Sequence, residues 1–112
     1  MDKTASPDFL LRRAINANPN DPFAWHILGV RMHSKQCIEE ALNCFQRAEQ
    51  IKSCFSASNQ FYLAMCLKEL NRTEEAIQML ESAITLPTRN AVDKKGHRSA
   101  QKLLDELRKE LK

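Results

Sequence analysis

Apolar residues recur every three or four positions along most of the chain, which is the period of an α-helix with one buried face. The clearest stripe lies near the C-terminal end, at Ala100, Leu103, Leu104, Leu107 and Leu111. Similar patterns predict six helices, over about 6–18, 21–34, 38–52, 57–70, 73–86 and 92–111. No strand-like alternation of useful length appears, so the predicted fold class is all-α.

Several predicted helices begin with residues that cap helix N-termini. At two starts a polar residue precedes a proline, the residue favoured at the first helical position because it lacks an N–H. The predicted caps are Ser6, Asp21, either Ser56 or Ser58, and Thr73. Short connections between consecutive helices favour antiparallel neighbours.

The chain repeats itself at an interval of 35 residues, and the residues that this shift pairs preserve size. Large residues match large and small match small, which chance would rarely produce at so many positions. The pairs are Leu28 with Leu63, Gly29 with Ala64, Met32 with Leu67, Ala41 with Ala76, Phe45 with Leu80, and Ala48 with Ala83. A single repeat cannot bury its own apolar face, so the repeat predicts antiparallel helix pairs stacked as a solenoid.

The small residues of the repeat predict where its two helices approach each other. Gly29 and Ala41 mark this approach in the first repeat, and bulky side chains fill the space beside it. Ala48 admits the following helix. The residues predicted to hold the repeats together are Trp25, Leu28, Gly29, Ala41, Phe45, Ala48, Leu63, Ala64, Ala76, Leu80 and Ala83.

This pattern resembles the tetratricopeptide repeat. The residues that carry the resemblance are Trp25-x2-Leu28-Gly29-x2-Met32 followed by Ala41-x3-Phe45-x2-Ala48, with Met32 where that family prefers Tyr. The resemblance implies one helical-repeat domain over 1–112. Its parts would be the second helix of a partial repeat (6–18), two repeats (21–53 and 57–89) and a capping helix (91–111).

A narrower resemblance covers nearly the whole chain. The run Phe45-x-Arg47-Ala48-Glu49-Gln50, together with segments 11–22 and 40–44, is similar to the C-terminal part of the regulator of microtubule dynamics family. Members of that family are longer, with more helical repeats ahead of this region. The resemblance implies a scaffold linked to microtubules and the spindle, with relatives at mitochondria or organelle contacts.

In tetratricopeptide arrays the first helix of each repeat lines a concave groove. By phase, the predicted groove positions are Phe23, His26, Val30 and His33, then Ser58, Phe61, Met65 and Lys68. Repeats that grip a C-terminal carboxylate need Lys and Asn at two of these positions. Here the two positions hold His26 and Val30 in the first repeat, and Phe61 and Met65 in the second. The predicted groove suits an amphipathic helix, a hydrophobic peptide or a lipid chain. A second interpretation stays open, in which the last helix or another repeat covers it.

Charge adds little to this picture. The net charge is +3, and residues 91–112 alone carry seven Lys or Arg against four acids. A solvated helix face of mixed sign explains this surplus more simply than binding to nucleic acid, tubulin or an anionic membrane. A nucleic-acid site would need a basic patch with interleaved aromatics, so no nucleic-acid partner is expected.

The sequence favours neither catalysis nor metal binding. It has no Gly-rich phosphate loop and no nucleophile elbow, so no enzyme activity and no cofactor are expected. His26 and His33 lie seven apart on one helix face, but two ligands do not close a metal site. The four cysteines read as semi-buried, reduced thiols. Neither a signal peptide nor an apolar run long enough for a membrane span is evident.

The expected function is therefore a non-enzymatic scaffold for protein–protein interaction, with a protein or peptide partner. Tubulin or microtubules are the candidates that the family resemblance implies, and self-association through the ends of the array is a further one. The alternative is a lipid-binding or organelle-tethering module that uses the apolar groove. The expected location is the cytoplasm, on microtubules or the spindle.

Overall fold

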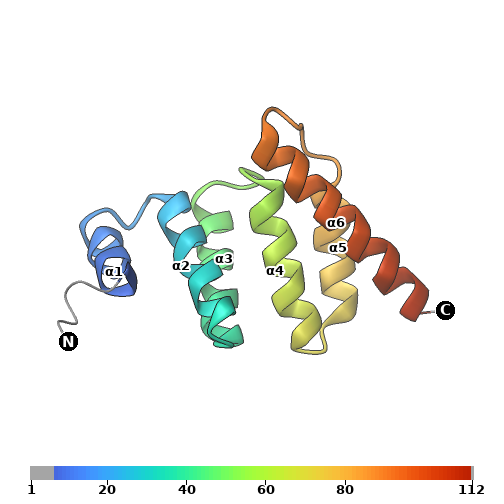
Figure 1. Ribbon diagram of the computed structural model, residues 1–112, viewed down its shortest axis with the longest axis horizontal. Coiled ribbons are helices and arrows are strands. Elements are labelled where there is room, and N and C mark those ends of the chain that lie inside the picture. The colour runs from blue at the N-terminus through green and yellow to red at the C-terminus, as the bar shows by residue number, and fades with distance from the viewer. Residues whose placement is uncertain (1–6, 112) are drawn as a thin grey trace. The chain divides into compact units, whose positions relative to one another are not determined.

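A computed structural model describes residues 7–111 and contains six α-helices (Figure 1). Their bounds are α1 Pro7–Ala17, α2 Pro22–Ser34, α3 Ile38–Ile51, α4 Ala57–Glu69, α5 Thr73–Ala83 and α6 Ala91–Glu110. None of the described residues lies in a strand. The predicted all-α class and the number of helices are therefore confirmed.

The chain forms two compact units, and the boundary between them falls at Ser53 and Cys54. The first unit holds α1, α2 and α3, and the second holds α4, α5 and α6. Each contains one predicted helix pair, α2 with α3 and α4 with α5, packed side by side. The boundary lies between the two predicted repeats, and one continuous domain over 1–112 stays a prediction.

The 35-residue repeat reappears in the backbone hydrogen bonds. Gln36 and Asn71, which the shift pairs, are both left-handed, with φ of 66° and 63°. In each repeat, the N–H of the residue that follows donates to the carbonyl oxygen five positions earlier in the chain. Cys37 N–H donates to Met32 O at 2.9 Å, and Arg72 N–H donates to Leu67 O at 2.8 Å. This arrangement satisfies the last carbonyls of a helix and reverses the chain. Both helix pairs are thus joined by the same turn.

Most helix starts agree with the prediction. The side chain of Asp21 accepts from Phe23 N–H at 3.0 Å, and Ser56, not Ser58, accepts from Asn59 N–H at 3.4 Å. The prediction for Thr73 is wrong: it is the first residue inside α5, and the cap position is Arg72, whose side chain makes no capping bond. Asn90 caps α6, which was not predicted, and Ser6 lies outside the described residues.

Helix α5 ends at Ala83, three residues before the predicted end at Leu86. Both the hydroxyl and the N–H of Thr85 donate to Ser82 O, at 2.6 and 3.1 Å. A threonine that hydrogen-bonds to nearby backbone competes with the helix, and Pro87 disfavours helical backbone at the residue before it. Local hydrogen bonding therefore ended the helix where the apolar period continued.

Almost all residues predicted to hold the repeats together are buried, and Trp25 is half-buried. In the first unit, Gly29 lies against the ring of Phe45. A Cβ built on Gly29 would lie 2.6 Å from Phe45 Cε1, closer than real Cβ contacts. Trp25 Nε1–H donates to Pro19 O at 2.9 Å, so the indole also fixes the turn before α2.

In the second unit, α6 packs on both α4 and α5. Four of its five predicted apolar positions are buried, whereas Leu111 is exposed. His97 Nε2–H donates to Ile84 O at 2.9 Å, and Arg108 pairs with Glu81 at 3.1 Å, which ties α6 to α5. Gly96 brings α6 against the start of α4, because a Cβ there would lie 2.7 Å from Ser58 N.

Candidate partner-binding groove

Helices α4 and α6 enclose a groove in the second unit, which we call the α4–α6 groove. Its larger part is a cavity of about 370 Å³ lined by Phe61, Met65, Lys68, Glu69, Ser99, Lys102, Leu103 and Glu106. A smaller part, about 250 Å³, shares Phe61 and Ser99 with it and is further lined by Ser58, Tyr62, Val92, Lys95 and Gly96. The predicted groove positions of the second repeat therefore lie together on one wall, and α6 supplies the other.

The direction of the two walls follows from these pairings. Ser58, at the start of α4, lies against Gly96, near the start of α6. Lys68 and Glu69, at the end of α4, line the same cavity as Glu106, near the end of α6. The two helices therefore run in the same direction along the groove. The two helices approach most closely at Gly96, where only glycine fits, and this approach sets one end of the groove.

The last helix therefore forms one wall of the second repeat's groove. Phe61 and Met65 remain partly accessible beside it, and Lys68 is exposed. The sequence could not distinguish this arrangement from a covered groove, because the apolar stripe of α6 shows which side is buried but not which helix it faces. Gly96 was the available signal: a glycine inside a helix, where it is intrinsically unfavourable, often marks a close approach.

The charges of the groove are distributed unevenly along it. Lys95 lines the smaller part near Gly96, whereas the larger cavity is lined by two lysines and two acids, Lys68, Glu69, Lys102 and Glu106. Within residues 7–111, ion pairs form at Asp8, Glu40, Glu75 and Glu81, and none of these involves a groove lysine. All three groove lysines are exposed.

The predicted groove residues of the first repeat lie on α2 in the first unit. Phe23 is 59% exposed, whereas Val30 and His33 are half-buried. The ring of His26 packs against Phe45, with 5.6 Å between centroids, so this imidazole belongs partly to the α2–α3 packing. Ile27, one turn after Phe23, is 48% exposed, and it was not among the predicted groove positions.

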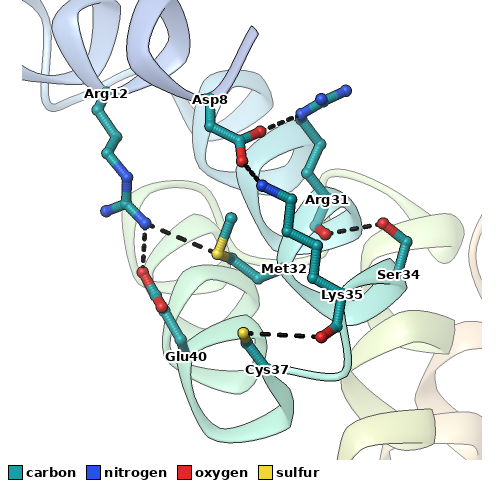
Figure 2. Close-up of polar contacts among 8 residues, drawn as sticks. All are labelled: Asp8, Arg12, Arg31, Met32, Ser34, Lys35, Cys37 and Glu40. Atoms are coloured by element: carbon teal, nitrogen blue, oxygen red, sulfur yellow. Dashed lines mark hydrogen bonds and ion pairs between the residues drawn. The ribbon is translucent and has the colours of Figure 1, made fainter. Parts of the chain in front are cut away.

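A cluster of charged side chains joins α1 to the rest of the first unit (Figure 2). The carboxylate of Asp8 forms ion pairs with Arg31 and Lys35 on the α2 side. Arg12 pairs with Glu40 of α3 at 2.6 Å and contacts the sulfur of Met32 at 3.6 Å. Figure 2 shows these pairs bridging from α1 to both helices of the repeat.

The cysteines divide into two classes. Cys37 and Cys54 are exposed, while Cys44 and Cys66 are buried, so the prediction of semi-buried thiols is wrong for all four. Burial, reinforced by nearby Glu40, raises the pKa of the Cys44 thiol to about 11. A thiol held neutral in this way is a poor nucleophile. Within the described part of the chain, no three His, Cys, Asp or Glu side chains gather as a metal site would require.

No helix among residues 7–111 is both long enough and apolar enough to cross a membrane.

The model of the family described as Regulator of microtubule dynamics protein 1-3 matches residues 30–108, a range that contains the whole α4–α6 groove.

Two relatives illustrate the similarity in sequence. Regulator of microtubule dynamics protein 2 of Mus musculus is 32% identical over 72 residues, which cover 64% of this chain and 18% of that protein. The peroxisomal targeting signal receptor of Saccharomyces cerevisiae (strain ATCC 204508 / S288c) is 31% identical over 83 residues, covering 74% of this chain and 13% of the receptor. The chain thus spans less than a fifth of these relatives' length.

A solved structure supports the fold. A chain in the CopN–Scc3 complex is similar with a TM-score of 0.71 at 19% identity, over 86% of this chain and 56% of that one. At that identity the likeness concerns the fold alone.

The match of the family model over most of the chain confirms the narrower resemblance found in the sequence. This chain belongs to the regulator of microtubule dynamics protein 1-3 family.

Proposed function

We propose that the chain is a non-enzymatic helical-repeat scaffold that binds a protein partner in the α4–α6 groove and contributes to microtubule association. The observation that carries the proposal is the groove itself: Phe61, Met65 and Leu103 offer apolar surface between walls that bear lysine and glutamate. Grooves of this kind between helices suit an amphipathic helix, whose apolar side fills the floor while its polar side meets the rims.

Membership of the family supports the link to microtubules, because its relatives are named as regulators of microtubule dynamics. The corresponding location is the cytoplasm, on microtubules or the spindle. The names of the matched relatives describe regulators and a receptor rather than enzymes. The groove lining contains neither His nor Cys, so it offers no thiol–imidazole pair for covalent catalysis.

A lipid chain fits the groove less well than a peptide. Lipid-binding cavities enclose most of an apolar ligand's surface. Here the larger cavity is bordered by exposed Lys68, Lys102 and Glu106, which would leave a bound acyl chain beside charged groups and water. The same groups can hydrogen-bond to the polar side of a peptide.

Co-sedimentation with polymerised tubulin at low ionic strength tests the microtubule association. We expect the chain to pellet with microtubules and Met65→Glu to reduce the bound fraction several-fold, because it places a charge on the apolar floor. Gln78→Glu, at an exposed position of α5, adds the same charge outside the groove and serves as the matched control. Circular dichroism checks that both variants stay folded. Failure of the unmodified chain to pellet, or equal loss in both variants, would contradict the proposal.

A further inference from the structure

We propose that the thiol of Cys54 is a site of oxidation by hydroperoxides, and that the buried amide of Gln60 holds the sulfenic acid that forms. Cys54 lies in the connection between α3 and α4, and Gln60 lies on α4. Both residues belong to the second unit. Neither residue lines the α4–α6 groove, so this site is independent of the proposed partner binding.

The side-chain amide of Gln60 is buried but only half satisfied. Gln60 is 2% exposed, and its Nε2–H donates to Cys54 Sγ at 3.6 Å. Within the described part of the chain, its Oε1 is buried with no hydrogen-bond partner. A buried polar atom without a partner is costly, and such atoms are rare in folded proteins. The amide next to the thiol is therefore prepared for a donor that the thiol form does not provide to it.

A sulfenic acid is a group of the required kind. Oxidation replaces S–H, a weak donor, by S–O–H, whose hydroxyl both donates and accepts. Nε2 and Oε1 belong to one planar amide, so a hydroxyl one bond beyond Sγ reaches Oε1 while the amide N–H still faces the sulfur. The match survives if the amide is turned by 180°, because a hydroxyl can serve either atom.

The other three cysteines lack this combination of exposure and a buried amide. Cys44 and Cys66 are buried, and oxidation favours accessible thiols. Cys37 is exposed like Cys54, but its sulfur faces the carbonyl oxygen of Lys35 at 3.9 Å, which accepts a hydrogen bond and cannot donate one. Cys37 therefore serves as an internal reference for Cys54.

The backbone of Cys54 supports the same contact. Its φ is 58°, in the left-handed region that residues with a side chain rarely adopt. This conformation restricts the directions in which Cβ and the thiol can point, and here the thiol points to the amide of Gln60. Residues held in such conformations cluster at functional sites.

The oxidation needs only the thiol and a hydroperoxide. The sulfur attacks, as a thiolate, one oxygen of the hydroperoxide. An S–O bond forms and the O–O bond breaks. The second oxygen leaves with the electron pair and takes a proton, so the peroxide is reduced by two electrons and the sulfur is oxidised by two. Protonation of the oxygen on sulfur gives the sulfenic acid.

The hydrogen bonds to Gln60 should prolong the life of this product. A sulfenic acid reacts onward either with a thiol, which displaces its oxygen as water and forms a disulfide, or with more peroxide to a sulfinic acid. The first reaction removes the hydroxyl, and the second requires its proton to leave. Both break the bond to the amide, so both should be slower at Cys54 than at Cys37.

Mass spectrometry of the whole reduced chain after brief exposure to hydrogen peroxide tests the inference. Dimedone traps sulfenic acids, forming a C–S bond and releasing water. With dimedone present from the start, we expect adducts on both exposed cysteines. With dimedone added after a delay, the fraction of adduct that survives should be at least threefold larger at Cys54 than at Cys37. Absence of any adduct at Cys54, or equal survival at the two cysteines, would overturn the inference.

Gln60→Leu tests the role of the amide. It places an apolar side chain of similar size in a buried position, and circular dichroism checks that the variant stays folded. We expect the surviving fraction at Cys54 to fall at least threefold, to the level of Cys37. Gln78→Leu, at an exposed position of α5, is the matched control and should leave this fraction unchanged. If Gln60→Leu leaves it unchanged as well, the amide does not hold the sulfenic acid, and the inference is wrong.

Discussion

Residue sizes are exchanged between the two repeats at one contact. Gly29 of α2 lies against the Phe45 ring in the first unit, and the repeat pairs these positions with Ala64 and Leu80 in the second. All four residues are buried. A smaller residue on one helix thus accompanies a larger residue on the other. Close-packed interiors conserve volume in this way, since each added methyl group must displace something.

This exchange predicts coupling between the two positions. Gly29→Ala alone should cost about 1–2 kcal/mol of unfolding free energy, because crowding of the Phe45 ring outweighs the roughly 1 kcal/mol that alanine gains in a helix. Adding Phe45→Leu should restore part of the loss, since the double variant carries the alanine–leucine pair of the second repeat. Urea unfolding of both single variants and the double variant measures the coupling. Strict additivity of the two changes would show that the positions do not share their volume.

At the scale of elements, the sequence predicted the helix pairs well because their determinants are local or repeated. Helical period, capping by Asp21 and the turn shared by Gln36 and Asn71 act over a few residues. The groove was only half predictable. Phase placed Phe61, Met65 and Lys68 on one face of α4, but the opposite wall depends on which helix receives the stripe of α6. That choice is tertiary, and Gly96 alone pointed to it.

Helix α1 illustrates how different contacts contribute unequally to docking. Its polar ties join Asp8, whose side chain is 16% exposed, to Arg31 and Lys35, which are 38% and 54% exposed. Ion pairs whose cations water still reaches contribute little, typically about 1 kcal/mol or less. Ile15 is 5% exposed, the only core apolar side chain that the described part of α1 supplies. Truncating a buried isoleucine typically costs about 2–5 kcal/mol. We therefore expect Ile15 to hold α1 in place, and the charges to orient it.

Hydrogen exchange of the variants tests this ranking. Ile15→Ala should raise the exchange rate of α1 amides more than tenfold, while Asp8→Asn should raise it only a few-fold. The amides at the centre of α3 should respond less to either change. Leu10→Ala, at a side chain 53% exposed on the same helix, is the control and should have little effect. A larger effect of Asp8→Asn than of Ile15→Ala would reverse the ranking.

At the scale of the whole molecule, the two units differ in how their cores are built. The second unit buries six leucines contributed by all three of its helices, Leu63, Leu67, Leu80, Leu103, Leu104 and Leu107. The first unit relies mainly on α2 and α3, with fewer large buried side chains. Units of 50–60 residues are marginal on surface-to-volume grounds, so a few leucines change their stability appreciably. The second unit should therefore be the more resistant to opening.

Native-state hydrogen exchange by mass spectrometry, resolved along the chain, measures this difference. We expect amides of α1 to exchange first, those of α2 and α3 next, and those of α4, α5 and the buried half of α6 last, because opening free energy follows buried apolar packing. Leu104→Ala, which removes a fully buried side chain, should cost about 2–5 kcal/mol and erase the advantage of the second unit. Leu111→Ala, on the same helix but 59% exposed, should leave the order unchanged. If protection were uniform from α1 to α6 in the unmodified chain, the leucines of the second unit would not govern its stability. The groove would then rest on a wall no firmer than α1, whereas the expected order makes α6 a rigid surface on which a partner helix can dock.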